Sequence, residues 1–127
     1  MNYILDTHVL LWSIFEPSKN SEIARNIITD RSVSRFVSIA SMWEISIKKR
    51  VGKLPFSSSI AQIFAIAESR GYGIIDIDKR HLEIYNTLPL LHRDPFDGIL
   101  VATAICEKMT IITADVNVQQ YDAPWTW

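Results

Sequence analysis

The chain has little cysteine, glycine or proline: its 127 residues include one cysteine, four glycines and five prolines. The single cysteine, Cys106, excludes an internal disulfide framework and a cysteine-based zinc site, and we expect it to be packed in the core. The low glycine and proline content excludes a collagen-like or disordered chain. The sequence therefore predicts a folded protein of a reducing compartment.

Long apolar runs and an excess of one charge are also missing. No apolar run approaches the roughly 18 residues that a membrane span needs, so we expect no membrane association. Residues 1–6 show neither the basic region nor the cleavage site of a secretory signal, which favours the cytoplasm. The formal net charge of -1 excludes the broad positive surface of a protein that coats duplex nucleic acid. Any nucleic acid must be held locally.

The hydrophobic content, 48%, is enough for one core, and we expect a single domain over residues 1–127. Short aliphatic segments alternate with longer amphipathic ones. Strands are predicted at residues 3–5, 36–39, 74–77, 110–113 and 125–127, and helices at 8–15, 21–29, 41–50, 57–70, 79–85 and 94–108, with a helical turn after residue 115. This alternation predicts an α/β fold with a mostly parallel sheet covered by helices on both faces. Ligands bind such sheets beyond the carboxyl ends of the strands.

Four acidic residues are expected at that edge of the sheet: Asp6, Glu44, Asp97 and Asp115. Carboxylates gathered in one place repel one another unless they are protonated or bound to a cation. A site made only of oxygen ligands suits Mg²⁺ or Mn²⁺ better than zinc. Such an ion can neutralise a phosphodiester and acidify a water for attack, so the four acids indicate a metal-dependent nuclease.

The same acids also have structural explanations. An Asp between a strand and a helix is a common N-cap, which applies to both Asp6 and Asp115. Glu44 matches a capping box that begins at Ser41, and it can also pair with Lys48 one turn later. In a parallel domain all helices that follow strands begin at one edge, so capping acids collect there and clustering alone is weak evidence.

A fifth acid, Asp94, stands before Pro95, the favoured first residue of a helix. We therefore assign Asp94 to the cap and Asp97, three residues later, to function. Capping does not explain why an acid is used each time, since Ser, Thr or Asn caps about as well without repulsion.

Five short motifs follow one another along the chain: ILDTHVLLW at 4–12, SMWEI at 41–45, GKL at 52–54, HRDPFD at 92–97 and TAD at 113–115. In this order and spacing the chain resembles the PIN-domain ribonucleases, and within them the VapC-type toxins of bacterial toxin–antitoxin pairs. The resemblance implies a three-layer α/β/α domain that binds Mg²⁺ or Mn²⁺, cleaves RNA internally, is inhibited by a cognate antitoxin and forms a homodimer.

The four acids of that family fall on Asp6, Glu44, Asp97 and Asp115. We assign Asp6 and Asp97 as the direct metal ligands, while Glu44 and Asp115 complete the pocket through water or a weaker contact. The chain departs from the family pattern at Gly98, where similar proteins commonly have an arginine, and at Asn117, where some have a further acid. The second departure makes a second metal ion less expected.

Basic residues near the acids are candidates for RNA contacts. Lys48, Lys49, Arg50 and Lys53 follow Glu44, and residues 92–93 (His-Arg) precede the Asp97 motif. They either bind phosphates of the RNA or stabilise the negative end of a helix and keep the surface soluble. The sequence leaves both roles open. Single-stranded or looped RNA is expected rather than duplex, because its backbone is accessible.

The remaining aromatic and histidine residues are expected to be structural. Trp12 and Trp43 lie on apolar helical faces and should pack in the core, and the three histidines are not spaced as a metal site. Two other functions remain open: an inactive PIN-like domain that binds RNA or protein, and a phosphoryl-transfer domain. Phosphoryl transfer is less favoured because His8 stands where a second acid would follow Asp6.

Overall fold

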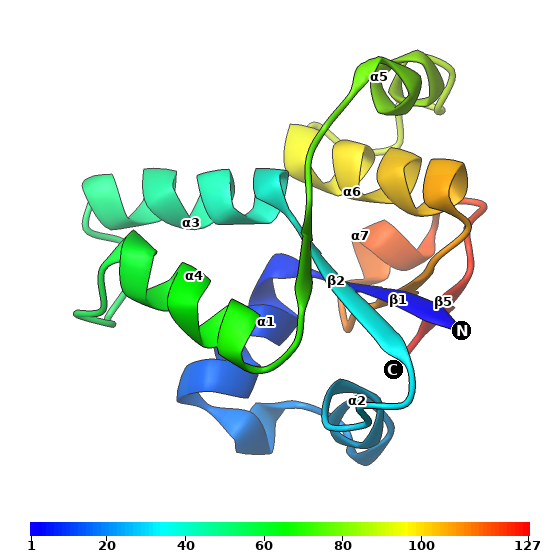
Figure 1. Ribbon diagram of the computed structural model, residues 1–127. Helices are drawn as coiled ribbons and strands as arrows, with labels where there is room; N and C mark the ends of the chain where they lie inside the picture. The colour runs from blue at the N-terminus through cyan, green and yellow to red at the C-terminus, as the bar shows by residue number, and fades with distance from the viewer.

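A five-stranded parallel sheet forms the centre of the computed structural model, which describes residues 1–127 (Figure 1). The strands are β1 Asn2–Leu5, β2 Ser34–Ser38, β3 Gly73–Ile75, β4 Thr110–Ile112 and β5 Trp125–Thr126. Their order is β3-β2-β1-β4-β5, and every neighbouring pair is parallel. The chain reverses its direction of winding between β1 and β4, the position at which sheets of this kind bind ligands.

Helices connect all the strands. They are α1 Thr7–Phe15, α2 Glu22–Ile28, α3 Ile39–Arg50, α4 Ile60–Ser69, α5 Lys79–Tyr85, α6 Pro95–Glu107 and α7 Val116–Gln119, with a 3-10 turn, η1, at Pro17–Lys19. All the predicted helices are present, and only η1 was not expected. None of them combines the length and the apolar character needed to cross a membrane.

Two hydrophobic cores lie on opposite faces of the sheet. Leu5, Val37 and Ile112 pack with α1 to α4, whereas their chain neighbours Ile4 and Ile111 pack with α6 and α7. The alternation follows the two-residue period of a strand. Helix α5 lies outside α6, away from the sheet (Figure 1). The predicted α/β fold with three layers is confirmed.

The start of α3 differs from the prediction. The helix begins at Ile39, because Ser38 ends β2 and its hydroxyl accepts the backbone N–H of Ala40 at 3.0 Å. The proposed capping box from Ser41 to Glu44 is therefore wrong, and Glu44 lies near the middle of the helix. This placement frees the Glu44 carboxylate from any capping role.

Two side chains are less buried than predicted. Trp43 is 62% exposed, because Met42 and Ile45 occupy the buried face of α3 and leave Trp43 to pack edge-on against Phe96 at 5.3 Å between ring centroids. Cys106 is only half-buried near the end of α6. The prediction that each packs in the core is wrong.

Candidate carboxylate metal site

Asp6 stands at the point where the chain leaves β1 for α1. It occupies the N-cap position, but its side chain makes no capping hydrogen bond. Instead, Asp6 Oδ2 accepts a hydrogen bond of 2.7 Å from Thr113 Oγ1, just beyond β4. The capping explanation is therefore wrong for Asp6, whose 6% exposed carboxylate lies at the reversal point of the sheet.

Thr113 connects two of the acids. Its fully buried hydroxyl donates to Asp6 and accepts the backbone N–H of Asp115 at 3.0 Å. Asp115 Oδ1 in turn accepts the N–H of Asn117 at 2.9 Å, so its capping role is confirmed. One Asp115 oxygen is used in the cap, and the other has no protein donor.

Glu44 reaches the same edge from α3. Its Oε1 accepts a hydrogen bond of 2.7 Å from Thr7 Oγ1, and its Oε2 pairs with Lys48 Nζ at 3.0 Å. The predicted pair one helical turn apart is confirmed. Glu44 is only 9% exposed, so this pair is better shielded from solvent than an ordinary surface ion pair.

Asp94 and Asp97, on the same helix turn, have different roles. Asp94 Oδ1 accepts the N–H of Phe96 at 2.9 Å, which confirms its assignment as the cap of α6. Asp97 is 8% exposed. Burial, and then repulsion from Asp94, Asp6 and the other two acids, raises the pKa of Asp97 to about 7.

The electrostatics of the acids fit a hard cation. Burial raises the pKa of Asp6, as does repulsion from Asp115 and Glu44, while the Thr113 hydrogen bond and His8 act in the opposite direction. A divalent ion among these oxygens would relieve that cost. No three of the four acids bring one oxygen each within 4.8 Å of one another, because separate partners hold them apart.

A cleft of about 210 Å³ gives access to this edge from solvent. It is lined by Asp6, His8, Val9, Trp12, Ala114 and Asp115. Trp12 was predicted to be a core residue, but it is half-buried and lies 6.0 Å from Trp127 between ring centroids. The cleft thus has two acids on one side and an aromatic wall.

The sequence interpretation missed the two residues that orient the acids, Thr7 and Thr113. Both carry hydroxyls that donate to a carboxylate across a long sequence separation. The available signal was position: Thr7 directly follows Asp6, and Thr113 stands two residues before Asp115. A hydroxyl residue beside an acid at a strand end is a recognisable pattern, but its partner is set by tertiary structure.

Gly98, the departure from the family pattern, has a packing reason. A Cβ at this position would lie 2.6 Å from Tyr85 Cε2, which is far inside van der Waals contact. Glycine therefore lets α5 pack its tyrosine directly on α6. A larger residue at position 98 requires Tyr85 to move.

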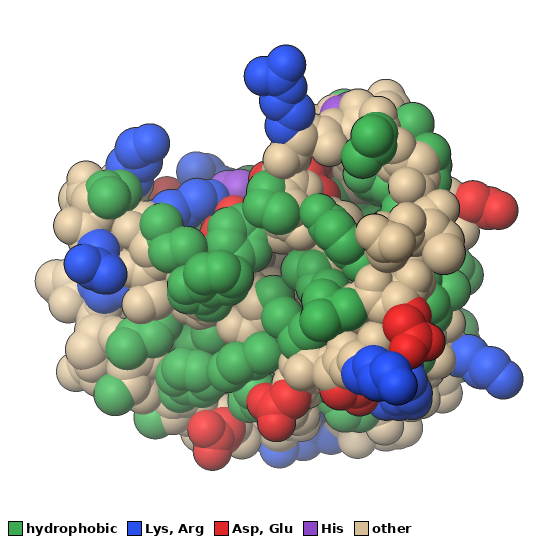
Figure 2. Space-filling view, turned by 90° about the horizontal axis from the view of Figure 1, so that it is seen from above, with side chains coloured by type: hydrophobic (Ala, Val, Ile, Leu, Met, Phe, Trp, Pro, Cys, Tyr) green, Lys and Arg blue, Asp and Glu red, His purple; other side chains and the backbone are tan.

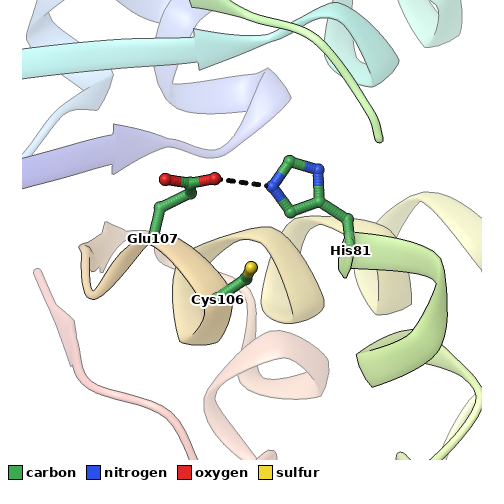
Figure 3. Close-up of side chains that lie close together, drawn as sticks. All are labelled: His81, Cys106 and Glu107. Atoms are coloured by element: carbon green, nitrogen blue, oxygen red, sulfur yellow. Dashed lines mark hydrogen bonds and ion pairs between the residues drawn. The ribbon is translucent and has the colours of Figure 1, made fainter. Parts of the chain in front are cut away.

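A second group of potential metal ligands, His81, Cys106 and Glu107, lies between α5 and the end of α6 (Figure 3). His81 is fully buried, its Nδ1 accepts the N–H of Asp78 at 3.0 Å, and its Nε2 is 2.9 Å from Glu107 Oε1. Because Nδ1 is an acceptor, Nε2 carries the proton and donates to Glu107. Arg80 also donates to this carboxylate, at 2.7 Å. These hydrogen bonds connect α5 to the end of α6, and they already use both ring nitrogens of His81 and Oε1 of Glu107.

Comparisons with known proteins agree with this architecture. A profile of the PIN domain matches residues 3–124, and no curated protein sequence matches the chain. Among solved structures, VapBC2 from Rickettsia felis, bound to a DNA fragment from their promoter, is similar with a TM-score of 0.76 and 19% identity over 99% of this chain and 98% of that chain. VapBC-1 from nontypeable Haemophilus influenzae has a TM-score of 0.71 and 21% identity over 99% and 97%. VapBC-5 from Mycobacterium tuberculosis, from a family of toxin–antitoxin systems, has a TM-score of 0.60 and 18% identity over 98% and 95%.

Proposed function

The chain belongs to the PIN domain family, and on that premise we propose that it is a divalent-metal-dependent endoribonuclease, the toxin of a toxin–antitoxin pair. The observation that carries the proposal is the state of Asp6 and Asp97. Both are buried carboxylates with raised pKa values, and neither caps a helix through its side chain. A structural role does not account for this cost, whereas a Mg²⁺ or Mn²⁺ site does.

In this proposal Asp6 and Asp97 hold the metal ion, and Glu44 and Asp115 complete the site. When bound, the ion supplies charge neutralisation of the phosphodiester and acidifies water. Thr113 fixes the orientation of Asp6 through a hydrogen bond of 2.7 Å. Glu44 is held at both oxygens by Thr7 and Lys48, which fixes its orientation beside the site, and in this proposal it orients the attacking water.

We propose RNA, single-stranded or looped, as the substrate. The cleft beside Asp6 is small, about 210 Å³, and a single strand can bring its backbone to such a site more readily than a duplex can. The basic stretch after Glu44 is partly committed, because Lys48 pairs with Glu44 and Lys49 Nζ donates to the Phe56 carbonyl at 3.4 Å. Arg50 and Lys53, both exposed, remain free for phosphate contacts in this proposal.

We also propose protein partners, a cognate antitoxin and a second copy of the chain, and a cytoplasmic location. Figure 2 views the side of α3, α5 and α6, where hydrophobic side chains gather across the middle of the surface. A groove of about 300 Å³ there is lined by Ala40, Trp43, Ile77, Leu82, Tyr85, Pro95, Phe96 and Ile99. Exposed apolar area of this kind supports a protein contact. The free cysteine agrees with a reducing compartment.

The proposed activity is tested by incubating the purified chain with labelled single-stranded RNA, with Mg²⁺ or Mn²⁺ and then with EDTA. Cleavage should require the metal. Asp97→Asn should reduce the rate at least about 100-fold, since removal of a metal ligand or its charge costs several kcal/mol. Asp94→Asn is the matched control: it makes the same change on the same helix turn, and asparagine still caps.

Metal-independent cleavage, or equal rates for Asp97→Asn and the wild type, would overturn the proposal. An inactive domain that still binds RNA in all variants would favour the binding-only alternative. Transfer of phosphate to the protein at Asp6 would instead favour the phosphoryl-transfer alternative.

The proposed partners are tested by light scattering of the chain alone and with its antitoxin. Trp43→Glu should weaken association at the apolar groove, since it places a charge on an exposed hydrophobic surface. Val51→Glu is the control, because Val51 is 61% exposed but lies outside the groove. Equal association of both variants and the wild type would rule out a protein contact at this groove.

A further inference from the structure

A second cavity lies at the opposite edge of the sheet, where the strands begin. It has a volume of about 360 Å³ and is lined by ten residues. Those that matter here are Asn20, Arg25, Arg31, Arg35, Arg70 and Tyr72. Arg35 is the second residue of β2, Tyr72 precedes β3 and Arg25 lies on α2, so this arginine pocket is formed where α2 meets the starts of these strands. Figure 1 shows α2 and the start of β2 in its lower part. None of the four acids of the carboxylate site lines it.

No ion pair compensates the charge of the arginine pocket. Four of the seven arginines in the chain line it, and no aspartate or glutamate does. The ion pairs of the protein involve Lys19, Lys48, Lys79, Arg80 and His81. None of the four pocket arginines takes part in one, which is unusual in a protein whose net charge is -1.

Helix ends explain part of this arrangement. Arg35 donates to the carbonyl of Ile28 and, at 3.1 Å, to that of Arg70, and Arg70 donates to the carbonyl of Ser13 at 2.8 Å. These carbonyls belong to the last turns of α2, α4 and α1. Each helix end carries roughly half a negative charge. Three such ends offset about one and a half of the four positive charges. Asp30, whose pKa is lowered by hydrogen bonds from Ser32 and by the charge of Arg35, offsets part of the rest, so the pocket keeps a positive surplus.

Buried polar atoms in the pocket also lack partners. Asn20 is 2% exposed, and neither its Nδ2 nor its Oδ1 has a hydrogen-bond partner. Arg35 is 5% exposed, and its Nε is also unpaired. A buried donor or acceptor without a hydrogen-bond partner lowers the stability of the fold by about 1–3 kcal/mol. These three atoms have almost no accessible surface, so a ligand in the cavity meets the guanidinium groups of the lining arginines and must offer acceptors to them.

We propose that the arginine pocket binds a phosphate group carried by a small molecule of nucleotide size. A phosphate offers several acceptor oxygens in different directions, which suits a cavity lined by four guanidinium groups, whereas a carboxylate offers two in one plane. The volume lies within the range of small-molecule sites. This inference does not depend on the proposed nuclease activity.

The test is titration calorimetry with the full chain in EDTA, at constant ionic strength set with chloride. EDTA prevents the carboxylate site from binding phosphate through a metal. Three probes separate the sources of the phosphate: inorganic phosphate, a nucleoside 5′-monophosphate, and a short single-stranded DNA that carries phosphodiesters. We expect saturable binding of one phosphate monoester per chain, tighter for the nucleotide than for inorganic phosphate.

Two exposed pocket arginines give variants that should fold normally: Arg25→Gln and Arg31→Gln. Each should weaken monoester binding about tenfold, since hydrogen bonds to charged groups are the strong ones. Lys79→Gln is the control, because Lys79 is an exposed cation at the start of α5 and lies outside the pocket. Its affinity should equal that of the wild type.

A third variant, Asn20→Asp, places a carboxylate of the same shape among the arginines. It should weaken phosphate binding, because its negative charge in the wall of the pocket repels the anion. The proposal is overturned if no probe binds saturably at millimolar concentration, or if Arg25→Gln, Arg31→Gln and Lys79→Gln bind alike. Binding of the DNA alone would replace the small molecule with a nucleic-acid strand and would also overturn it.

Discussion

The two edges of the central sheet carry opposite charge. At the carboxyl edge, four acids gather around the ends of β1 and β4 with Lys48 as the one cation paired to them. At the amino edge, four arginines gather beside the starts of β2 and β3 with no acid among them. The same fold thus holds a negative site and a positive pocket at its two ends.

Helix polarity accounts for the sign of each edge. In a parallel α/β domain, helices begin at the carboxyl edge and end at the amino edge, so their positive ends favour acids and their negative ends favour arginines. What polarity does not account for are groups that serve no helix end. These are Asp6 and Asp97 at one edge, and Asn20 and Arg35 Nε at the other. These groups, which helix polarity does not explain, are the candidates for function.

The largest expected effect is a loss of folding stability when a buried arginine at the amino edge is truncated. Arg35→Ala should lower the free energy of unfolding by about 3 kcal/mol, because two helix-end carbonyls lose their donor and Tyr72 loses a guanidinium 5.1 Å from its ring centre. Urea unfolding measures this. Arg31→Ala, at an exposed position of the same pocket, should change stability by less than about 0.5 kcal/mol. Equal losses would mean that pocket charge, and not these hydrogen bonds, sets stability.

The next effect concerns the orientation of Asp6. Thr113→Val keeps the shape of a fully buried side chain but removes the hydroxyl that Asp6 accepts from. Cleavage should fall about 10- to 100-fold. The acid limb of the pH–rate profile should also move to higher pH, because the hydrogen bond from Thr113 lowers the pKa of Asp6 and its loss raises that pKa. Thr103→Val is the control, because that buried hydroxyl bonds only the Ile99 carbonyl. An unchanged pH profile would contradict the role of Thr113.

A smaller effect of opposite sign is expected at the carboxyl edge, where removing the charge of a buried acid should raise the stability of the fold. Asp97 has a pKa of about 7 in the folded protein against 3.8 for the ordinary side chain. Its contribution to stability is therefore intact below pH 4 and is lost as pH rises through 7. In EDTA at pH 8, Asp97→Asn should raise the free energy of unfolding by about 1–2 kcal/mol, less than half of the value for the full shift, because solvent screens the open side of the site.

The gain from Asp97→Asn should vanish below pH 4, where the wild-type carboxyl is protonated as well. Millimolar Mg²⁺ at pH 8 should raise the melting temperature of the wild type more than that of the variant. Thermal unfolding at three pH values, with and without Mg²⁺, measures both effects. A variant less stable than the wild type at pH 8 would show that Asp97 is structural.

The smallest effect tests how much of the acid edge is capping. Asp115→Ala should cost about 1 kcal/mol of stability, because α7 loses the acceptor for the N–H of Asn117. Asp115→Asn should cost close to nothing, since asparagine caps equally well. If only the alanine variant is less stable while both variants are inactive, the Asp115 oxygen caps α7 and the Asp115 charge is needed at the carboxylate site.

The sequence predicted most of the fold because its signals are local. Strand and helix periods, proline at the start of α6 and serine or aspartate caps each depend on neighbouring residues. Where two local signals competed, prediction failed: Ser38 and Ser41 both suit a cap, and the end of β2 selected Ser38. The prediction that Trp43 is buried failed for the same reason, because the residue at which α3 begins decides which of its faces is buried.

The sequence by itself determined that acids stand at strand ends and that the chain belongs among parallel α/β domains, because a strand followed by an acid and a helix is a local pattern. Only the tertiary structure decided which acids are caps, since Asp6 bonds Thr113 across 107 positions of sequence while Asp115 bonds its own helix. It alone also brought together Asn20 and the four pocket arginines, because the ends of α1, α2 and α4 meet only when the sheet is formed.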